Sequence, residues 1–221
     1  MDYRTHNNSY SSYVRNAIEN IPEGQPIVFN TITNNMVKKY NIDEAHANQI
    51  VTLNINRLAD NNIVERLYKG VYYRPKNTPL GKLRINPQKI FIEQLIKEGN
   101  KITGYETGPT LFNTVGLSTW MSNDYHLVTN KYRRKLPLNV KIELHKPVVE
   151  VNNENYRYLQ VLDIIDGLDK YHIDTEDPND VIRNTVKKLG INVLKILAYA
   201  DKYYKKLTLL KSVRILTEGA I

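Results

Sequence analysis

Residues 54–76 read NINRLADNNIVERLYKGVYYRPK, and this stretch decides the fold of the first third of the chain. Its beginning closes a helical pattern, and its end alternates in the manner of two short strands joined by a turn. Gly70 permits the positive φ that such a turn requires. Pro75 lacks a backbone amide and ends the second strand. The stretch therefore predicts a helix followed by a hairpin over 63–74.

The helix that ends in this stretch is predicted to span 44–60. Asp43 precedes its first turn, where a carboxylate can accept free backbone amides, so Asp43 is the predicted N-cap. One face of this helix carries apolar residues at helical spacing and is predicted to face a core. These apolar residues are Ala47, Ile50, Val51, Ile55 and Leu58.

Two further helices are predicted upstream, over 9–20 and 31–40, with an extended piece at 26–29 between them. Val14 and Ile18 lie on the inward face of the first, and Ile32 and Met36 on that of the second. Three helices followed by a two-stranded ribbon is the order of a winged helix-turn-helix. The sequence thus predicts a winged helix-turn-helix DNA-binding domain at 1–76.

The rest of the chain predicts a short linker and a second domain. Residues 77–84 are the linker, and 85–221 form a mixed, mostly helical domain with a small β-sheet. Strands are predicted at 125–129 and 140–144, and Asn179 is the predicted N-cap of a helix over 180–189. The other helices are predicted over 88–99, 108–115, 158–168, 191–206 and 208–216. The fold class is therefore α+β.

The chain has 221 residues, a net charge of +8 and no cysteine. Residues 1–76 contain 9 Lys and Arg against 7 Asp and Glu, a net +2; residues 77–147 contain 11 against 5, a net +6. Residues 148–221 balance at 11 against 11. A basic protein of this kind is compatible with nucleic acid binding. The absence of cysteine excludes disulfides and thiolate sites.

No stretch approaches the about 20 apolar residues of a membrane span, and the N-terminus lacks an apolar signal core. We therefore expect a cytoplasmic protein without a membrane partner.

The exposed face of the helix at 44–60 has the chemistry of base recognition. Short polar side chains can hydrogen-bond base edges in the major groove, and Gln or Asn can pair with adenine through two bonds. Gln49, Thr52 and Asn56, followed by Arg57, occupy this face. An alternative is a solvated face or one that binds protein. The predicted phosphate contacts are Lys38 and Lys39 at the end of the second helix and Arg66, Lys69 and Arg74 on the hairpin.

A basic run follows the strand at 125–129. Its cations are Lys131, Arg133, Arg134 and Lys135, with Tyr132 among them. Such a run could follow a phosphate backbone and stack on a base. A solvated turn or a surface for an acidic protein partner would look the same in the sequence.

No catalytic or metal-binding motif is expected, and no cofactor. The histidines at 6, 46, 126, 145 and 172 are scattered and match no ligand spacing such as HExxH. The one catalytic alternative is a metal-dependent nuclease using Asp124, Glu143 and Lys146. Alternation along a strand argues against it, because Glu143 and Lys146 fall on opposite faces.

Several stretches together resemble the AbiEi-type antitoxins of bacterial type IV, abortive-infection toxin–antitoxin systems. They are a Ser-Tyr-Val helix, NRLADNNIVERLYKGVYYRP at 56–75, TGYETGPTLFNTVGLST at 103–119 and HLVTN at 126–130. The resemblance covers residues 9–147. Trp120 departs from it, since relatives often have glutamine after Gly-Leu-Ser-Thr.

This resemblance implies a non-enzymatic antitoxin and transcriptional repressor. The winged helix would bind inverted repeats in promoter DNA and repress its own operon. The second domain would counteract a nucleotidyltransferase-like toxin without a stable complex, as the type IV class implies. The alternative is a protein-interaction module that binds a toxin or another partner directly, with little role for DNA.

Overall fold

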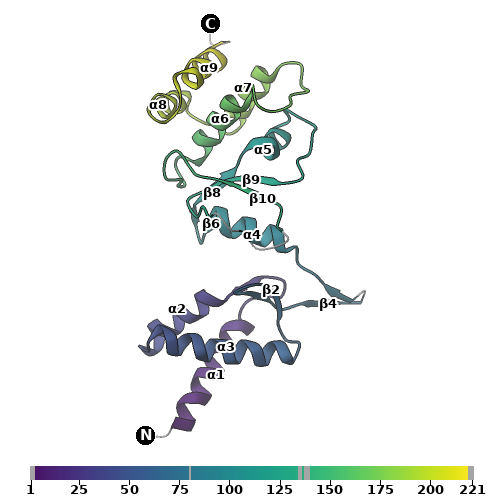
Figure 1. Ribbon diagram of the computed structural model, residues 1–221, viewed down its shortest axis with the longest axis vertical. Helices are drawn as coiled ribbons and strands as arrows, with labels where there is room; N and C mark the ends of the chain where they lie inside the picture. The colour runs from purple at the N-terminus through teal and green to yellow at the C-terminus, as the bar shows by residue number, and fades with distance from the viewer. Residues whose placement is uncertain (1–2, 80, 134–135, 137–139, 219–221) are drawn as a thin grey trace. The chain divides into compact units, whose positions relative to one another are not determined.

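A computed structural model describes residues 3–79, 81–133, 136 and 140–218 of the chain (Figure 1). The chain divides into two compact units, Met1–Ile90 and Phe91–Ile221. The fold is mixed α+β and rich in helix, as the sequence predicts. Over the residues described, no helix has both the length and the apolar character needed to cross a membrane.

In its described residues, the N-terminal unit contains three complete helices, a three-stranded sheet, a separate hairpin and the start of a fourth helix, α4 (Pro87–Ile96). Its elements are α1 (Tyr3–Glu19), β1 (Pro26–Val28), α2 (Phe29–Tyr40), α3 (Glu44–Asp60), β2 (Glu65–Tyr68), β3 (Val71–Tyr73), β4 (Lys76–Thr78) and β5 (Gly81–Leu83).

The bounds of α3 match the prediction because local chemistry fixes both of its ends. The Asp43 side chain accepts a hydrogen bond of 2.8 Å from the amide of His46, which confirms the predicted N-cap. Asn41 adopts a left-handed φ of 51° and ends α2, so only a short turn separates α2 from α3. The predicted apolar stripe of α3 is buried, together with Val14 and Ile18 of α1.

The sheet of this unit has the strand order β1-β3-β2, and both pairings are antiparallel. The predicted extended piece at 26–29 thus becomes an edge strand beside the hairpin. Gly70, with φ 79°, forms the turn between β2 and β3. Tyr73 is only 5% exposed, and its hydroxyl donates a 2.6 Å hydrogen bond to Glu65 across the hairpin.

The predicted linker contains secondary structure. Strands β4 and β5 pair in an antiparallel hairpin, and Lys82 forms a 2.9 Å ion pair with Glu65 of β2. The division between the two units lies further along the chain, at residues 90 and 91.

The C-terminal unit combines a small mixed sheet with a set of helices. The remaining elements are α4 (Pro87–Ile96), β6 (Lys97–Glu98), β7 (Lys101–Ile102), β8 (Gly104–Glu106), α5 (Gly108–Val115), β9 (Tyr125–Thr129), β10 (Ile142–His145), α6 (Tyr156–Gly167), α7 (Pro178–Lys188), α8 (Val193–Tyr203) and α9 (Lys206–Thr217).

The sheet has the order β10-β9-β8, in which β9 pairs antiparallel with β8 and parallel with β10. Helices α4 and α6 lie on opposite faces of this sheet (Figure 1). Thr129 of β9 donates a 2.6 Å hydrogen bond to the carbonyl of Leu95 in α4. On the other face, Asp163 of α6 accepts hydrogen bonds from Thr107 (2.9 Å) and Tyr204 (2.7 Å). Burial raises the pKa of Asp163, and these donors oppose that rise.

The prediction of Asn179 as the N-cap of α7 is wrong. Asp177 fills this role, since its side chain accepts the amide of Asp180 at 2.9 Å. Pro178 then stands at the start of the helix, where its missing amide costs nothing and its fixed φ suits helical backbone. The proline is therefore part of the helix, and the cap lies before it.

Candidate nucleic-acid interface

The exposed face of α3 carries the residues predicted to read bases. Gln49, Thr52 and Asn56 are all exposed, and their spacing of three and four residues aligns them along one side of the helix. Leu53 lies between them and is 58% exposed. The sequence reasoning missed Leu53, although helical spacing places it near the centre of this face. The face is therefore polar with one apolar side chain in its middle.

Arg57 lies at the side of this face, toward α1. It lines a shallow pocket of about 320 Å³ together with Arg15 and Ser11 of α1. Arg15 is itself paired with Glu19 at 2.8 Å. Arg57 is exposed and thus adds positive charge at the C-terminal end of α3.

The two lysines at the end of α2 differ in their surroundings. Lys39 places its ammonium 4.6 Å from the ring centre of Tyr13 and 5.4 Å from that of Tyr40. These cation–π contacts hold Lys39 against the junction of α1 and α2. Lys38 is exposed.

Two of the predicted phosphate-binding cations on the β2–β3 hairpin are exposed, and a third, Arg74, is bonded to backbone carbonyls. Arg66 and Lys69 are exposed. The Arg74 guanidinium donates to the carbonyls of Glu19 (2.8 Å) and Ile21 (3.2 Å), and it lies 3.7 Å from a carboxylate oxygen of Glu23. Arg74 thus ties the end of the hairpin to the end of α1.

An acidic side chain also lies on this hairpin. Hydrogen bonds from Tyr73 and then Lys82 lower the pKa of Glu65, which is therefore ionised at neutral pH. Its charge is balanced locally by Lys82.

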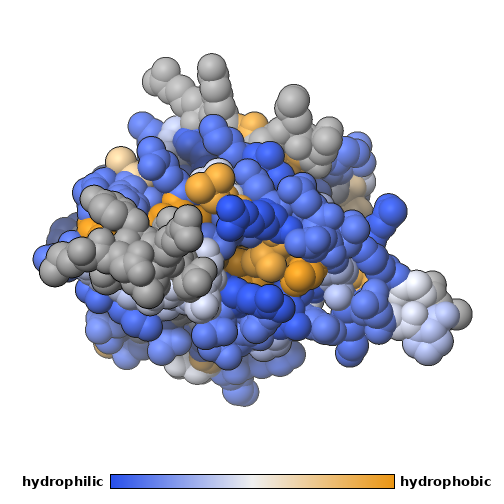
Figure 2. All heavy atoms as spheres, turned by 90° about the horizontal axis from the view of Figure 1, so that it is seen from below, coloured by the Kyte–Doolittle hydropathy of each residue, from blue (hydrophilic) through white to orange (hydrophobic). Residues whose placement is uncertain are grey.

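Figure 2 shows one face of the molecule, which is mostly hydrophilic with small hydrophobic areas near its centre.

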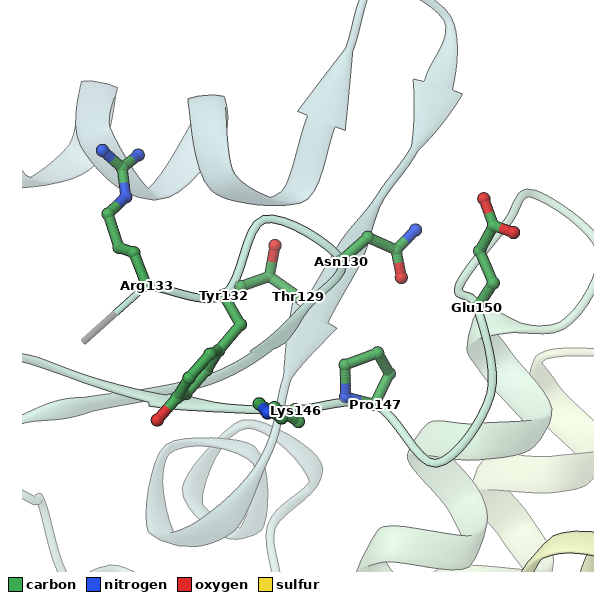
Figure 3. A pocket seen from close by; sticks show the side chains of 7 residues that line it. All are labelled: Thr129, Asn130, Tyr132, Arg133, Lys146, Pro147 and Glu150. Atoms are coloured by element: carbon green, nitrogen blue, oxygen red, sulfur yellow. The ribbon is translucent and has the colours of Figure 1, made fainter.

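The predicted basic run of the second half begins beside a cleft of about 690 Å³ (Figure 3). The cleft is lined by Thr129, Asn130, Tyr132, Arg133, Lys146, Pro147 and Glu150. Arg133 and Tyr132 point away from each other (Figure 3), and the Arg133 guanidinium lies 5.1 Å from the ring centre of Phe91. Lys146 lies 5.3 Å from the ring centre of Tyr132. Arg134 and Lys135 fall outside the described residues.

The side chain of Lys131 is bound to other groups of the protein. Its ammonium donates to the carbonyls of Gln94 (2.9 Å) and Lys97 (3.2 Å) and lies 3.6 Å from Glu98. These partners lie at the C-terminal end of α4 and just beyond it. Lys131 therefore fastens the loop after β9 to that helix end.

Two of the histidines predicted to be scattered come together in the C-terminal unit. His126 of β9 and His145 of β10 place ring nitrogens 3.4 Å apart, and Glu143 lies beside both. Burial lowers the pKa of His126; Glu143 opposes this effect and His145 adds to it. The nuclease alternative required Glu143 and Lys146 to act together, whereas Glu143 contacts these histidines and Lys146 contacts Tyr132.

Residues 33–166 match a family model described as "Family of unknown function (DUF6088)". The chain belongs to this family. The DUF6088 match begins within α2 and ends within α6, so it includes α3, the β2–β3 hairpin and the sheet of the second unit. A comparison with curated proteins found no match to the chain.

Proposed function

We propose that the N-terminal unit is a winged helix that binds double-stranded DNA, with α3 in the major groove and the β2–β3 hairpin as its wing. The observation that carries the proposal is the exposed row Gln49, Thr52 and Asn56 on a helix whose opposite side is buried. The exposed cations Arg66 and Lys69 on the adjoining hairpin support it.

The side chains of α3 suit sequence recognition. Gln and Asn offer a donor and an acceptor together, as the exposed edge of adenine requires, and Thr can donate, accept or touch a thymine methyl. Leu53, at the centre of the same row, could also contact a thymine methyl. Phosphate contacts would come from Lys38, Arg57, Arg66 and Lys69, which position the protein without reading sequence.

We further propose that the chain acts as an antitoxin of the AbiEi type. The resemblance of 9–147 supports this role, with the N-terminal unit repressing the chain's own operon and the C-terminal unit counteracting a nucleotidyltransferase-like toxin. In this proposal the protein is not an enzyme and acts in the cytoplasm. Neutralisation of the neighbouring toxin in a bacterial growth assay, by the chain and by a variant that no longer binds DNA, tests the second role separately.

An electrophoretic shift on the DNA upstream of the chain's own gene tests the first role. We expect a sequence-specific shift, abolished for a scrambled duplex at moderate salt. Asn56→Ala should cost about 1–3 kcal/mol of binding free energy, mainly at one base pair. Asn184→Ala, an exposed asparagine on α7, is the matched control and should bind as the unchanged chain does. Equal binding to all duplexes would contradict base reading by α3.

Leu53 favours a second candidate function, in which the same face of α3 binds a protein. Protein interfaces have an apolar centre with a polar rim, and Leu53 at the centre of this polar face has that arrangement. Co-purification with the neighbouring gene product, lost in Leu53→Ala but kept in Leu194→Ala (76% exposed on α8), would support this alternative. Co-purification that Leu53→Ala leaves unchanged would contradict it.

A further inference from the structure

The parallel pairing of β9 and β10 brings together a group of metal-binding side chains. The register places His126 directly opposite Glu143, and His145 lies two residues beyond Glu143. Side chains two residues apart share one face of a strand, so all three project from the same face of the sheet. The cluster thus follows from the strand register and lies within one compact unit.

The distances within this cluster are those of side chains that can share one metal ion. Nδ1 of His126 lies 3.4 Å from Nε2 of His145, while Oε2 of Glu143 lies 3.6 Å from the first nitrogen and Oε1 of Glu143 lies 3.5 Å from the second. A tetrahedral zinc ion with bonds of about 2.0–2.1 Å separates its ligand atoms by roughly 3.3–3.4 Å. One ligand atom from each residue lies within 4.8 Å of the other two, so small side-chain rotations bring all three to the spacing of a shared ion.

The orientation of the two imidazoles also suits a shared ligand. Their ring planes are within 15° of parallel, and their centroids are 5.6 Å apart. Because the nearest nitrogens are much closer than the centroids, the rings meet at their edges, where the lone pairs lie. A modest rotation of each ring directs both lone pairs to one point. The His145 side chain is 36% exposed and that of Glu143 is 56% exposed, so these two are the more accessible members of the cluster.

Hydrogen bonding alone leaves this cluster short of donors. Two neutral imidazoles share one N–H between their facing nitrogens, and the adjacent carboxylate offers acceptors only. A cation bound by all three groups satisfies every facing lone pair at once. The glutamate side chain is 56% exposed, which leaves one side of the cluster open to solvent.

We propose that His126, Glu143 and His145 bind a divalent transition-metal ion, with Zn²⁺ as the ion the donor set fits best. Two imidazoles and one carboxylate form a ligand set that zinc accepts with a water molecule in the fourth position. The ion joins β9 to β10 and so stabilises the folded C-terminal unit. This site lies outside the proposed DNA-binding face and does not depend on that function.

Zinc titration of the full-length, tag-free chain after chelator treatment tests the proposal. Isothermal titration calorimetry should give one ion per chain, with an affinity at least about 10-fold higher than in His145→Ala or Glu143→Gln. His172→Ala is the matched control, since that exposed histidine pairs with Asp174 and is not one of the three clustered residues. It should bind zinc as the unchanged chain does, and zinc should raise the thermal midpoint of both proteins.

Cobalt(II) provides an independent readout of geometry. Co²⁺ in the same site should give the intense visible absorption of a four-coordinate ion, and Glu143→Gln should lose it. Both tested side chains are at least partly exposed, so circular dichroism should show that their variants keep the fold. If His145→Ala nonetheless unfolds, the Glu143→Gln variant decides. Absence of saturable zinc binding, or equal affinity in the unchanged chain and Glu143→Gln, would overturn the proposal.

Discussion

Arg66 and Lys69 on the β2–β3 hairpin contrast with Arg74 and Lys131, although all four were predicted from sequence to bind nucleic acid. The first two are exposed. The guanidinium of Arg74 is bonded to carbonyls at and just after the end of α1, and the ammonium of Lys131 to carbonyls at and just after the end of α4. The same residue types therefore occupy two different physical settings.

The difference shows how helix ends capture cations. The last carbonyls of a helix lack partners within the helix and carry partial negative charge. A lysine or arginine that reaches them gains charge-assisted hydrogen bonds. Such a cation is less available to phosphate, because leaving the carbonyls would expose acceptors that need partners. Within the described part of the chain, the side chains of Arg66 in β2 and Lys69 at the turn have no hydrogen bond or ion pair that would compete with phosphate.

Substitution of a carbonyl-bonded cation should lower the stability of the fold more than substitution of an exposed one, and this is the largest difference that we expect between the two groups. We expect Arg74→Ala to lower the free energy of unfolding by about 1.5–3 kcal/mol, because it removes charged hydrogen bonds to two backbone carbonyls. Urea unfolding followed by circular dichroism measures this loss. Arg66→Ala is the matched control and should change stability by less than about 0.5 kcal/mol. Equal stability of the two variants would remove the distinction between them.

The fold of the N-terminal unit was largely predictable because its signals are local. Asp43 caps α3 through a residue three positions away, and the apolar stripe of α3 repeats at helical spacing. Gly70 marks the turn by its own backbone freedom. Such features depend on neighbours in sequence, so periodicity and turn chemistry suffice to find them.

The helix-end contacts of Arg74 and Lys131, and the histidine cluster, depend on partners that are distant in sequence. Local sequence patterns therefore did not predict them. Arg74 contacts residues 53 and 55 positions earlier, and Lys131 contacts residues 34 and 37 positions earlier. His126 meets Glu143 only through the register of two parallel strands. Alternation along a strand shows which side chains share its face, but it leaves the neighbouring strand and its register undetermined.

A smaller stability effect is expected for Lys131, the second cation that is bonded to carbonyls at a helix end. Lys131→Ala should lower the free energy of unfolding of the C-terminal unit by about 1 kcal/mol, the usual scale for a cation at a helix C-terminus. The measurement is urea unfolding at low and high salt, since screening should reduce the difference. Lys195→Ala, an exposed lysine on α8 of the same unit, is the comparison variant. A loss as large in Lys195→Ala would show that general charge, rather than the helix end, is responsible.

The exposed cations should instead alter the salt dependence of DNA binding. If Lys69 contacts a phosphate, Lys69→Ala should make the slope of log affinity against log salt shallower by about 0.9 and weaken all duplexes alike. Filter binding at a series of salt concentrations gives the slope. Lys131→Ala should leave that slope unchanged. A reversed result, with Lys131 controlling the slope, would assign the phosphate contacts to the loop after β9.

The smallest effect concerns Glu65, which places negative charge on the proposed wing. Hydrogen bonds from Tyr73 and then Lys82 hold its pKa below the ordinary 4.5. Since the folded pKa is lowered, ionised Glu65 contributes stability that is complete above the unfolded pKa. That stability is lost as pH falls through the lower, folded value. Tyr73→Phe should therefore raise the pKa of Glu65. It should also reduce the loss in the free energy of unfolding that accompanies the protonation of Glu65 at low pH.

Carboxyl-detected NMR titration of Glu65 measures this change. Tyr73→Phe should raise the pKa of Glu65 more than Lys82→Arg does, because it removes the hydrogen bond that lowers this pKa most, whereas arginine keeps a charged donor beside the carboxylate. The reverse order would mean that the ion pair with the β4–β5 hairpin controls this charge. In that case the segment after the wing, rather than Tyr73 within the wing, would make the larger contribution to the stability that is lost as Glu65 is protonated in acid.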